Sequence, residues 1–492
     1  MNEELVPDGE PESSSRARLV ATLRSIRMEP DVFRIVALWA AWLVVICAFQ
    51  IVVSARVSPQ RPDTVLGWTA NETGDGYPVA TGIGCRPLLA DPNINEHVAF
   101  DSEYYIAIAA GGYDNPESQA YVYDTAGGKV VNAGVPTCTA GMDGWTPLNY
   151  AFMPGYPVAM KGVMDAIGGA SRLAGLTTTG LATLSGLIVS ALGGLLAMLA
   201  LARLMAFLDR RRRGAAEESE AGSDWGGIGG LRAAFYLLAF PTGFYLAQVY
   251  SDGLFLGLAF MACALAVEKK VVGAAIFAGL AAITRQAGLF LFLPLAWSAF
   301  EILRNPATRP MGWRLVVPVA AALVPLAVFG AWFVSPLGQN WQVVEREFFS
   351  RSFDLPKSID TWSKAWSSLV SGVDKTATAG GYGVYGGGSL ASSTSVYIAL
   401  EFASFALSLV ATVWLFWKRM PGVALFGLAV VVLSAGSSGA QGMDRYVLAV
   451  PAIFLMLAWY GRHAVFDRTW VMASTLMMGM LAMLFTFGFW VS

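Results

Sequence analysis

The feature that most constrains this chain is a series of apolar runs, each close to the length needed to cross a lipid bilayer. A membrane-spanning helix needs about 20 mostly apolar residues. Eleven such runs cover 32–53, 176–207, 230–249, 252–268, 271–284, 287–303, 315–334, 395–417, 421–435, 446–461 and 469–490. Of the 492 residues, 55% are hydrophobic and 14% are charged. The sequence therefore predicts an all-α polytopic membrane protein with about eleven transmembrane helices.

Charges at the ends of these runs predict the side of the membrane that each end faces. The tail 1–31 carries four arginines, and the clusters "DRRRR" (209–213), "EKK" (268–270) and "KR" (418–419) follow later runs. Positively charged flanks usually stay in the cytoplasm. We therefore expect a cytoplasmic tail 1–31 and a transmembrane domain 32–492. Within that domain, 55–175 and 335–394 are expected as extracytoplasmic loops, the first with juxtamembrane helices. A multi-pass protein of a plasma membrane is expected, and the alanine-rich, lysine-poor composition hints at a bacterium.

The overall charge and the cysteines narrow the class of protein further. A net charge of −2 argues against a nucleic-acid partner, because binding a phosphate backbone needs a dense basic surface. Cys47 and Cys263 lie inside apolar runs and are interpreted as small core residues. Cys85 and Cys138 share the first large loop, and the sequence leaves open whether they form a disulfide there. No spacing typical of a metal site is visible, so neither a metal nor another cofactor is expected.

Polar residues collect at those ends of the runs that are predicted to be extracytoplasmic. These residues are Asp101, Ser251 with Asp252, Thr284 with Arg285, and Asp444 with Arg445. Charges near membrane depth are costly unless they are paired, hydrated or functional. For any single residue, a position at headgroup level explains the sequence equally well. Both signs at several ends on one side favour a pocket for a phosphorylated, hydroxyl-rich ligand, with arginines on phosphate and carboxylates on hydroxyls.

Five stretches resemble, in order, the sequence blocks of PIG-V-like mannosyltransferases, which are integral-membrane glycosyltransferases of the GT-C class. They are "AFDSEYYIAIAAGGY" (99–113), "YAFMPGYPVAM" (150–160), "QVYSDGLFLGLAF" (248–260), "ITRQAGLFLF" (283–292) and "MDRYVLAVPAIFLMLA" (443–458). This chain departs from the family pattern at three positions, where Phe100 replaces a tryptophan, Met153 a phenylalanine and Asp252 a glutamate. The resemblance implies a GT-C-like helix bundle with a large first extracytoplasmic loop.

The resemblance also implies a reaction. It is the transfer of mannose, with inversion, from a polyprenyl-phosphate-linked donor to a hydroxyl of a glycolipid or protein acceptor outside the cytoplasm. Inversion needs one base, and Asp101 matches the aspartate of the family's first loop, so Asp101 is the expected catalytic residue. Capping of the helix that follows is an alternative role for Asp101, compatible with catalysis. The expected substrate-binding residues are Glu103, Tyr105, Tyr156, Ser251, Asp252, Arg285, Arg445 and Tyr446.

Several alternatives stay open at this stage. Arg285 and Arg445 could pair with Asp252 or Asp444 and bind no phosphate. "FMPGYP" (152–157) is expected to begin a surface-lying helix over 150–168, and "QVVEREFFSR" (342–351) is interpreted as an amphipathic, solvated face. The rival functions are a membrane transporter of a lipid-linked or polar solute and a non-catalytic membrane subunit. The charges at external ends and the lack of related halves favour the enzyme. The sequence identifies neither the acceptor nor, beyond the resemblance, the sugar.

Overall fold

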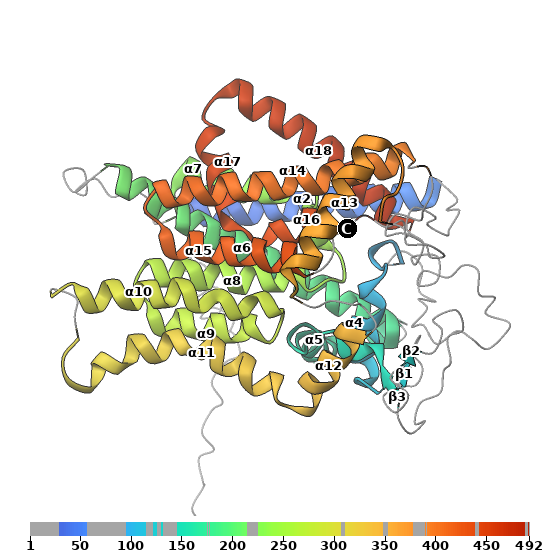
Figure 1. The fold of residues 1–492 in the computed structure, drawn as a ribbon, viewed down its shortest axis with the longest axis horizontal. Helices are drawn as coiled ribbons and strands as arrows, with labels where there is room; N and C mark the ends of the chain where they lie inside the picture. Colours follow the sequence, from blue (N-terminus) through green and yellow to red (C-terminus); the bar gives the residue numbers. More distant parts are fainter. Residues whose placement is uncertain are drawn as a thin grey trace, which may run out of the picture.

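In the computed structural model the chain forms a bundle of long helices that run side by side, with shorter helices gathered at one end (Figure 1). The structure describes residues 29–56, 95–114, 122–124, 129–130, 145–174, 176, 178–213, 225–306, 310–347, 353–376, 389, 391–437, 442–487 and 491. Its α-helices are α2 (Pro30–Arg56), α4 (Asp101–Gly111), α5 (Gly155–Ala174), α6 (Thr178–Arg213), α7 (Gly227–Leu238), α8 (Asp252–Val267), α9 (Val271–Ala282), α10 (Phe292–Arg304), α11 (Val316–Phe333), α12 (Pro336–Glu347), α13 (Leu355–Ser371), α14 (Ser392–Trp417), α15 (Pro421–Gly436), α16 (Met443–Tyr446), α17 (Pro451–Tyr460) and α18 (Ala464–Thr486). Within the described residues, six 3-10 helices join them: η2 (Asn95–His97), η3 (Leu148–Ala151), η5 (Gly243–Ala247), η6 (Gln286–Leu291), η7 (Gly312–Leu315) and η8 (Val447–Ala449).

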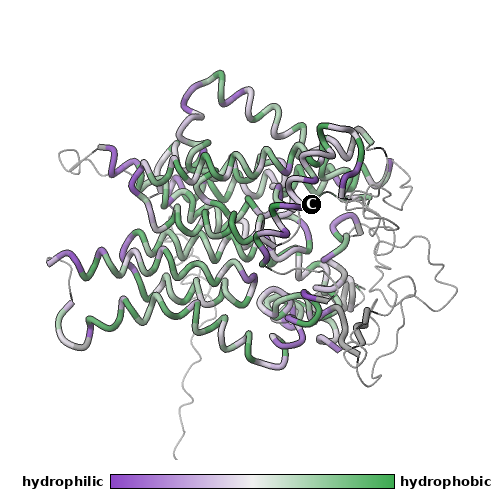
Figure 2. Tube along the Cα trace, in the orientation of Figure 1, coloured by the Kyte–Doolittle hydropathy of each residue, from purple (hydrophilic) through white to green (hydrophobic). Residues whose placement is uncertain are grey.

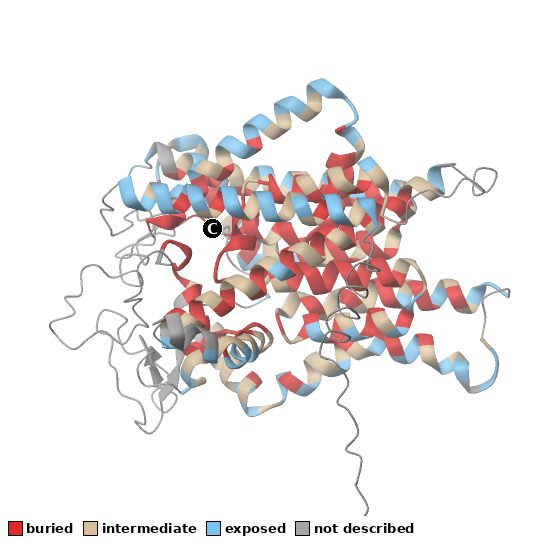
Figure 3. Cartoon of the chain, turned by 180° about the vertical axis from the view of Figure 1, so that it is seen from behind, coloured by how far each residue is buried: buried red, intermediate tan, exposed pale blue. Residues whose placement is uncertain are grey.

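The bundle has the length and surface of a polytopic membrane protein. Among the described residues, six helical segments are long and apolar enough to cross a bilayer: Pro30–Arg56, Gly180–Arg212, Gln286–Arg304, Val316–Phe333, Thr394–Trp417 and Ala464–Thr486. Hydrophobic residues make up most of the length of these helices (Figure 2), and the outer helices expose many side chains (Figure 3). Val44 on α2 and Leu476 on α18, for example, are 69% and 71% exposed. The predicted all-α polytopic class is confirmed.

Each of the eleven predicted runs is helical for most of its described length, but not all of them are single long helices. The helices α7, α8, α9 and α15 are apolar but only 12 to 16 residues long. The run 230–249 breaks after α7 because Pro241 has no amide hydrogen to continue the helix. The run 446–461 is a pair of helical pieces that meet at 82°, and Pro451 begins the second piece. The number of membrane crossings therefore stays a prediction.

The centre of the bundle is the contact between α6 and α8, which small residues bring close together. A Cβ atom added at Gly253 would lie 2.1 Å from the carbonyl oxygen of Ser190, and one at Gly257 would lie 2.5 Å from the carbonyl oxygen of Gly193. Glycines four residues apart let two helix backbones approach in this way. The approach also positions Asp252, which is the first residue of α8 and precedes Gly253.

One end of the bundle carries the short elements and is called the site end below. There α4, α5, η3 and α12 pack beside a three-stranded antiparallel sheet of β1 (Val122–Asp124), β2 (Lys129–Val130) and β3 (Trp145–Pro147), in the order β2-β1-β3. Figure 1 shows α5 nearly end-on, whereas the bundle helices run across the view. Helix α5 is not among the helices apolar enough to cross a bilayer. Both observations agree with the surface-lying helix predicted from 150–168.

Candidate active site

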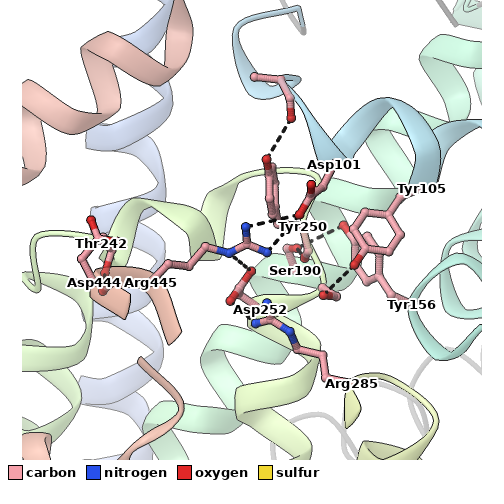
Figure 4. Close-up of polar contacts among 12 residues, drawn as sticks. Asp101, Tyr105, Tyr156, Ser190, Thr242, Tyr250, Asp252, Arg285, Asp444 and Arg445 are labelled. Atoms are coloured by element: carbon pink, nitrogen blue, oxygen red, sulfur yellow. Dashed lines mark hydrogen bonds and ion pairs between the residues drawn. The ribbon is translucent and has the colours of Figure 1, made fainter. Parts of the chain in front are cut away.

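A cavity of about 340 Å³ opens at the site end, between α4, η3, α8, η6, α12, α15 and α16. Its polar lining includes Asp101, Tyr105, Arg285, Glu345, Arg445 and Tyr446, and its apolar lining includes Phe152, Phe255 and Trp341. The lining residues come from segments that are more than 300 positions apart in the sequence. Figure 4 shows that Asp101, Arg285 and Arg445 point toward one another. The size and the mixed lining are those of a small-molecule site.

Four charged side chains form a continuous chain of ion pairs at the floor of this cavity (Figure 4). Arg445 donates from Nη2 and Nη1 to Oδ2 of Asp101 at 3.2 and 3.3 Å, and from Nε to Oδ2 of Asp252 at 3.1 Å. Arg285 donates to the other carboxylate oxygen of Asp252. The sequence predicted that these four residues share one pocket, and three of them, Asp101, Arg285 and Arg445, do line this cavity. Asp252 is fully buried beneath the cavity and is not among its lining residues.

Burial decides what each member of the chain can do. The side chain of Asp252 is 0% exposed and that of Arg445 7%, whereas Arg285 is 17% and Asp101 31% exposed. Asp252 is therefore a fixed counterion that joins two arginines, because a buried charge needs close partners. Asp101 and Arg285 present their polar atoms to the cavity. Of the two pairings that the sequence left open, Arg285 pairs with Asp252, but Arg445 pairs with Asp101 and Asp252 and makes no ion pair with Asp444.

The guanidinium group of Arg445 rests on aromatic rings that sequence reasoning did not select. It lies 4.5 Å from the ring centroid of Tyr250 and 5.2 Å from that of Tyr245. The hydroxyl of Tyr250 donates to the carbonyl oxygen of Ala99 at 3.0 Å, two residues before Asp101. Tyr250 thus connects the arginine to the loop that carries its carboxylate partner. Its only signal in the sequence was its place in "QVYSDG", two residues before Asp252.

Asp101 begins α4 but does not cap it. The N-cap residue is Phe100, whose φ of 52° and ψ of −113° are unusual for a residue with a side chain, and the N-cap makes no side-chain capping bond. The predicted capping role of Asp101 is therefore wrong, because its carboxylate turns to Arg445. A backbone in such a sparsely populated region costs about 1–3 kcal/mol and persists where surrounding contacts demand it. Here it begins the helix one residue before the carboxylate that faces the cavity.

Three of the predicted substrate-binding residues contact one another: Tyr105, which lines the cavity, touches both Ser251 and Tyr156. Tyr105 lines the cavity, and its hydroxyl donates to the hydroxyl oxygen of Ser251 at 2.9 Å. Burial raises the pKa of Tyr105 above its ordinary value, so this phenol stays protonated. Tyr156 packs edge-on against Tyr105 and donates to the carbonyl oxygen of Gly186. Ser251 and Tyr156 are fully buried and do not line the cavity, so their place is that of supports for Tyr105.

The remaining predicted residues near α4 and α16 fall in different places. Tyr446 lines the cavity, and its ring centroid lies 5.6 Å from the guanidinium carbon of Arg285. Glu103 is on α4, but its side chain lies outside the described residues. Asp114, in a turn that follows the end of α4, accepts a hydrogen bond from the hydroxyl of Tyr150 at 3.0 Å. Cys85 and Cys138 also lie outside the described residues.

Two acidic residues of the site region were missed or misinterpreted. Glu401, on α14, accepts backbone N–H bonds of 2.6 Å from both Gly442 and Met443, and so fixes the first turn of α16. An acid within an apolar run was the signal that could have found it. Glu345 was assigned to a solvated face of "QVVEREFFSR", but it lines the cavity. That correction depends on how α12 packs against η3, which the periodicity of the helix alone does not contain.

Two of the sequence blocks meet at a close backbone contact. The amide of Gly155, at the start of α5, donates to the carbonyl oxygen of Ile283 at 2.8 Å. A Cβ atom at Gly155 would lie 2.5 Å from the hydroxyl oxygen of Thr284, the residue before Arg285. Glycine is required here because any side chain would push the two segments apart. The contact sets Arg285 against the wall that Phe152 and Tyr105 form.

Comparison with known proteins gives no family. No family model matches the chain, and no curated protein matches it. Among solved structures it is similar to the archaeal oligosaccharyltransferase AglB from Archaeoglobus fulgidus in complex with an inhibitory peptide and a dolichol-phosphate, with 14% identity and a TM-score of 0.35 over 92% of this chain and 55% of that one. The oligosaccharyltransferase of Archaeoglobus fulgidus in its apo form has 11% identity and a TM-score of 0.38, over 92% of this chain and 56% of that one. Its complex with Zn and sulfate has 14% identity and a TM-score of 0.36, over 91% of this chain and 53% of that one. The chain spans about half the length of these structures, and the function must be argued from the site.

Among the described residues, no group of three or more His, Cys, Asp or Glu side chains is placed to hold a metal ion. What the cavity offers is two carboxylates, on Asp101 and Glu345, and two arginines fixed by a buried carboxylate. Of the two carboxylates, that of Asp101 is paired with one of these arginines. A carboxylate can accept a proton, and fixed guanidinium groups can bind an anionic leaving group.

Proposed function

We propose that the chain is an inverting glycosyltransferase of GT-C type that moves mannose from a polyprenyl-phosphate-linked donor to a hydroxyl of a glycolipid or protein acceptor. The observation that supports it most directly is the ion-pair chain Asp101–Arg445–Asp252–Arg285 beside one cavity. It joins a single exposed carboxylate to two arginines in the same 340 Å³ space. An inverting transfer needs one base on one side of the anomeric carbon and a stabilised phosphate on the other.

Asp101 is the proposed general base. Both bonds from Arg445 go to Oδ2, and among the described residues no side chain donates to Oδ1. Oδ1 can therefore accept the proton of the acceptor hydroxyl while that oxygen attacks the anomeric carbon. The new bond joins the acceptor oxygen to the anomeric carbon, and the bond from that carbon to the donor phosphate oxygen breaks. The bonding electrons leave with the phosphate.

Arg285 and Arg445 are the proposed partners of the leaving phosphate. Only one nitrogen of Arg285, Nη1, is used by Asp252, so other N–H groups of this guanidinium remain for phosphate oxygens. Guanidinium groups bind phosphate in bidentate geometry and keep their charge at any relevant pH. Because Asp252 holds both arginines, their positions are set before the donor arrives. Such preorganised charge stabilises the transition state without a reorganisation cost.

The aromatic lining is the proposed contact surface for the sugar. Tyr105 and Tyr446 present rings to the cavity beside Arg285 and Asp101, and Trp341 of α12 adds a third ring. Aromatic faces pack against the apolar C–H faces of sugars, whereas polar side chains take the hydroxyls. A hexose and one phosphate fit the lower end of the volume range of small-molecule pockets.

The direct test is a transfer assay with the purified protein in detergent. Polyprenyl-phosphate mannose and candidate acceptor glycolipids or peptides are supplied, and the products are analysed by mass spectrometry. The expected result is an acceptor heavier by one hexose, with an α-linkage from a β-linked donor or the reverse. A folded protein that binds the donor but leaves it intact with every acceptor would contradict the proposal. Movement of intact donor across a vesicle membrane would favour a transporter.

A further inference from the structure

Helix α13, at the site end, has small side chains on its inner side and large apolar ones on an outer side. With about 100° of turn per residue, its buried residues fall on one side: Ser358, Ala365 and Ser368. On another side four large apolar residues fall within about 60° of one another and are exposed: Leu355 at 49%, Ile359 at 68%, Trp366 at 54% and Val370 at 71%. These four residues are called the apolar stripe. A helix whose outer surface faced only water would bury such side chains and expose the small polar ones.

A third side of α13 is polar. Asp360, Ser363, Lys364 and Ser367 are exposed there, and Nζ of Lys364 pairs with Oδ2 of Asp360 at 2.7 Å. Helix α13 is not among the helices that are long and apolar enough to cross a bilayer. An apolar stripe beside a charged side is instead the pattern of a helix that lies in the interface between lipid and water.

The contacts of α13 with α14 place the stripe at membrane depth. Trp362 and Trp366 both pack edge-on against Phe402 of α14, with ring centroids 5.0 and 5.3 Å apart. Phe402 lies inside the candidate span Thr394–Trp417, eight residues after its start. Eight residues of helix measure about 12 Å, and interfacial helices bury their apolar side about 5–10 Å deep. The lipid that surrounds α14 therefore reaches the stripe beside it (Figure 1).

Other contacts of α13 run to the wall of the active-site cavity. The amide of Asp354, the N-cap residue of α13, donates to the carbonyl oxygen of Gly436 at 3.1 Å. The indole Nε1 of Trp362 donates to the carbonyl oxygen of Ala435 at 3.1 Å. Both acceptors are in the last turn of α15, and Phe353, just before Asp354, lines the cavity itself. Helix α13 is thus bonded to the cavity wall, while its stripe faces outward.

We propose that the apolar stripe of α13 is inserted into the lipid monolayer at the site end, where acyl chains cover its four side chains and the polar side faces water. Insertion removes exposed apolar surface from water, which is favourable, and tryptophan is enriched at membrane interfaces. Because α13 is bonded to the cavity wall, the insertion fixes the distance between the cavity and the lipid surface. It is independent of the proposed transfer reaction, since no residue of the stripe lines the cavity.

The test measures the surroundings of single fluorescent labels on α13, with the full chain in nanodiscs of phosphatidylcholine. The four native cysteines are changed to alanine. A cysteine is then introduced on the stripe by Ile359→Cys or on the polar side by Lys364→Cys, and it is labelled with NBD. The label at position 359 is expected to emit at shorter wavelength and to be quenched by lipids with a nitroxide on the acyl chain. The label at position 364 is expected to be quenched by iodide dissolved in the water.

Three results would overturn the insertion. Iodide quenching as strong at position 359 as at position 364 would place the stripe in water. Lipid quenching as strong at position 364 as at position 359 would mean that the stripe and the polar side do not differ. Protection of the label at position 359 from both quenchers would mean that protein covers the stripe, as in contact with a second copy of the chain.

Two double variants link the insertion to the stripe itself. Leu355→Asp with Val370→Asp puts two charges on the stripe, where lipid disfavours them. It should raise iodide quenching of the label at position 359 to the level found at position 364. Ser363→Asp with Ser367→Asp adds the same charge to the polar side and should leave the quenching unchanged. An equal rise with both pairs would reduce the effect to net charge and would overturn the assignment. Unfolding temperatures check that each variant folds.

Discussion

The two ends of the bundle both carry ion pairs, but the pairs differ in burial and in the distance along the chain that they join. At the site end, Asp252 and Arg445 are 0% and 7% exposed, and their pair joins positions almost 200 residues apart. At the other end, Glu268 and Lys269 are 15% and 36% exposed, and their partners Arg203 and Glu301 are 65 and 32 residues away.

This difference decides how strongly each charged side chain depends on its partner. A buried pair that loses one partner leaves an uncompensated charge in a medium of low polarity, so each member depends strongly on the other. A half-exposed pair is screened by water, which replaces the lost partner. The buried pairs at the site end therefore fix the positions of their side chains, whereas the more exposed pairs at the opposite end depend less on their partners.

The largest expected effect is on the reaction at the site end. Asp101→Asn removes the proposed base and keeps the size of the side chain, so turnover in the transfer assay should fall by about 10²–10⁴. The unfolding temperature should change little, because the carboxylate is 31% exposed. The control is Asp114→Asn, which removes a carboxylate that follows the same helix and is bonded to Tyr150. It should keep most of the activity. Full turnover in a folded Asp101→Asn protein would reject Asp101 as base.

The next effect is on stability and sharpens the contrast in burial. Asp252→Asn leaves Arg285 and Arg445 without their shared counterion in a buried position, which should destabilise the fold by about 3–5 kcal/mol. Activity should fall as well, because both arginines lose their positions. Thermal unfolding in detergent, followed by tryptophan fluorescence, measures the change. An unfolding temperature equal to that of the unmodified chain would mean that the buried pairs do not hold the site together.

Neutralising an ion-paired acid at the other end should lower the stability much less. Glu268→Gln removes the partner of Arg203 and Lys270, but all three side chains are partly exposed. The expected loss is about 1 kcal/mol or less, after screening by water is taken into account. A loss of stability as large as that of Asp252→Asn would erase the difference between the two ends.

The last effect concerns pH and the two histidines, one at each end. His97 is buried near Ala247 and Gln248, and burial lowers its pKa in the folded protein below the ordinary value of 6.5. The unfolded chain then binds the proton more readily. Stability from this group is complete above about pH 6.5 and is lost as pH falls toward the folded pKa, at up to about 1.4 kcal/mol per pH unit.

Paired substitutions isolate this effect. His97→Gln should reduce the fall in unfolding temperature between pH 7 and pH 5. His463→Gln changes the exposed histidine at the other end and should leave the fall as it is. An identical pH profile for His97→Gln and the unmodified chain would mean that His97 does not titrate in this range.

The sequence predicted the helices and the charged residues that form the ion pairs, for a physical reason. The apolar runs report a membrane environment directly, because a helix in lipid must be apolar over about 20 residues. Asp101, Asp252, Arg285 and Arg445 stood out for the same reason, since charges are costly beside such runs. The family resemblance supplied the roles, and these stay proposals.

Only the tertiary structure decided which of these charges meet and what lies behind them. Arg445 could have paired with its neighbour Asp444, but the turn of α16 directs it to Asp101 and Asp252. That direction depends on Tyr250, in the segment before α8, and on the fixing of α16 by Glu401 of α14. Local patterns reflect neighbours within a few residues, and they predicted where helices run. Contacts between segments hundreds of residues apart are set by how the helices pack, and no local pattern contains them.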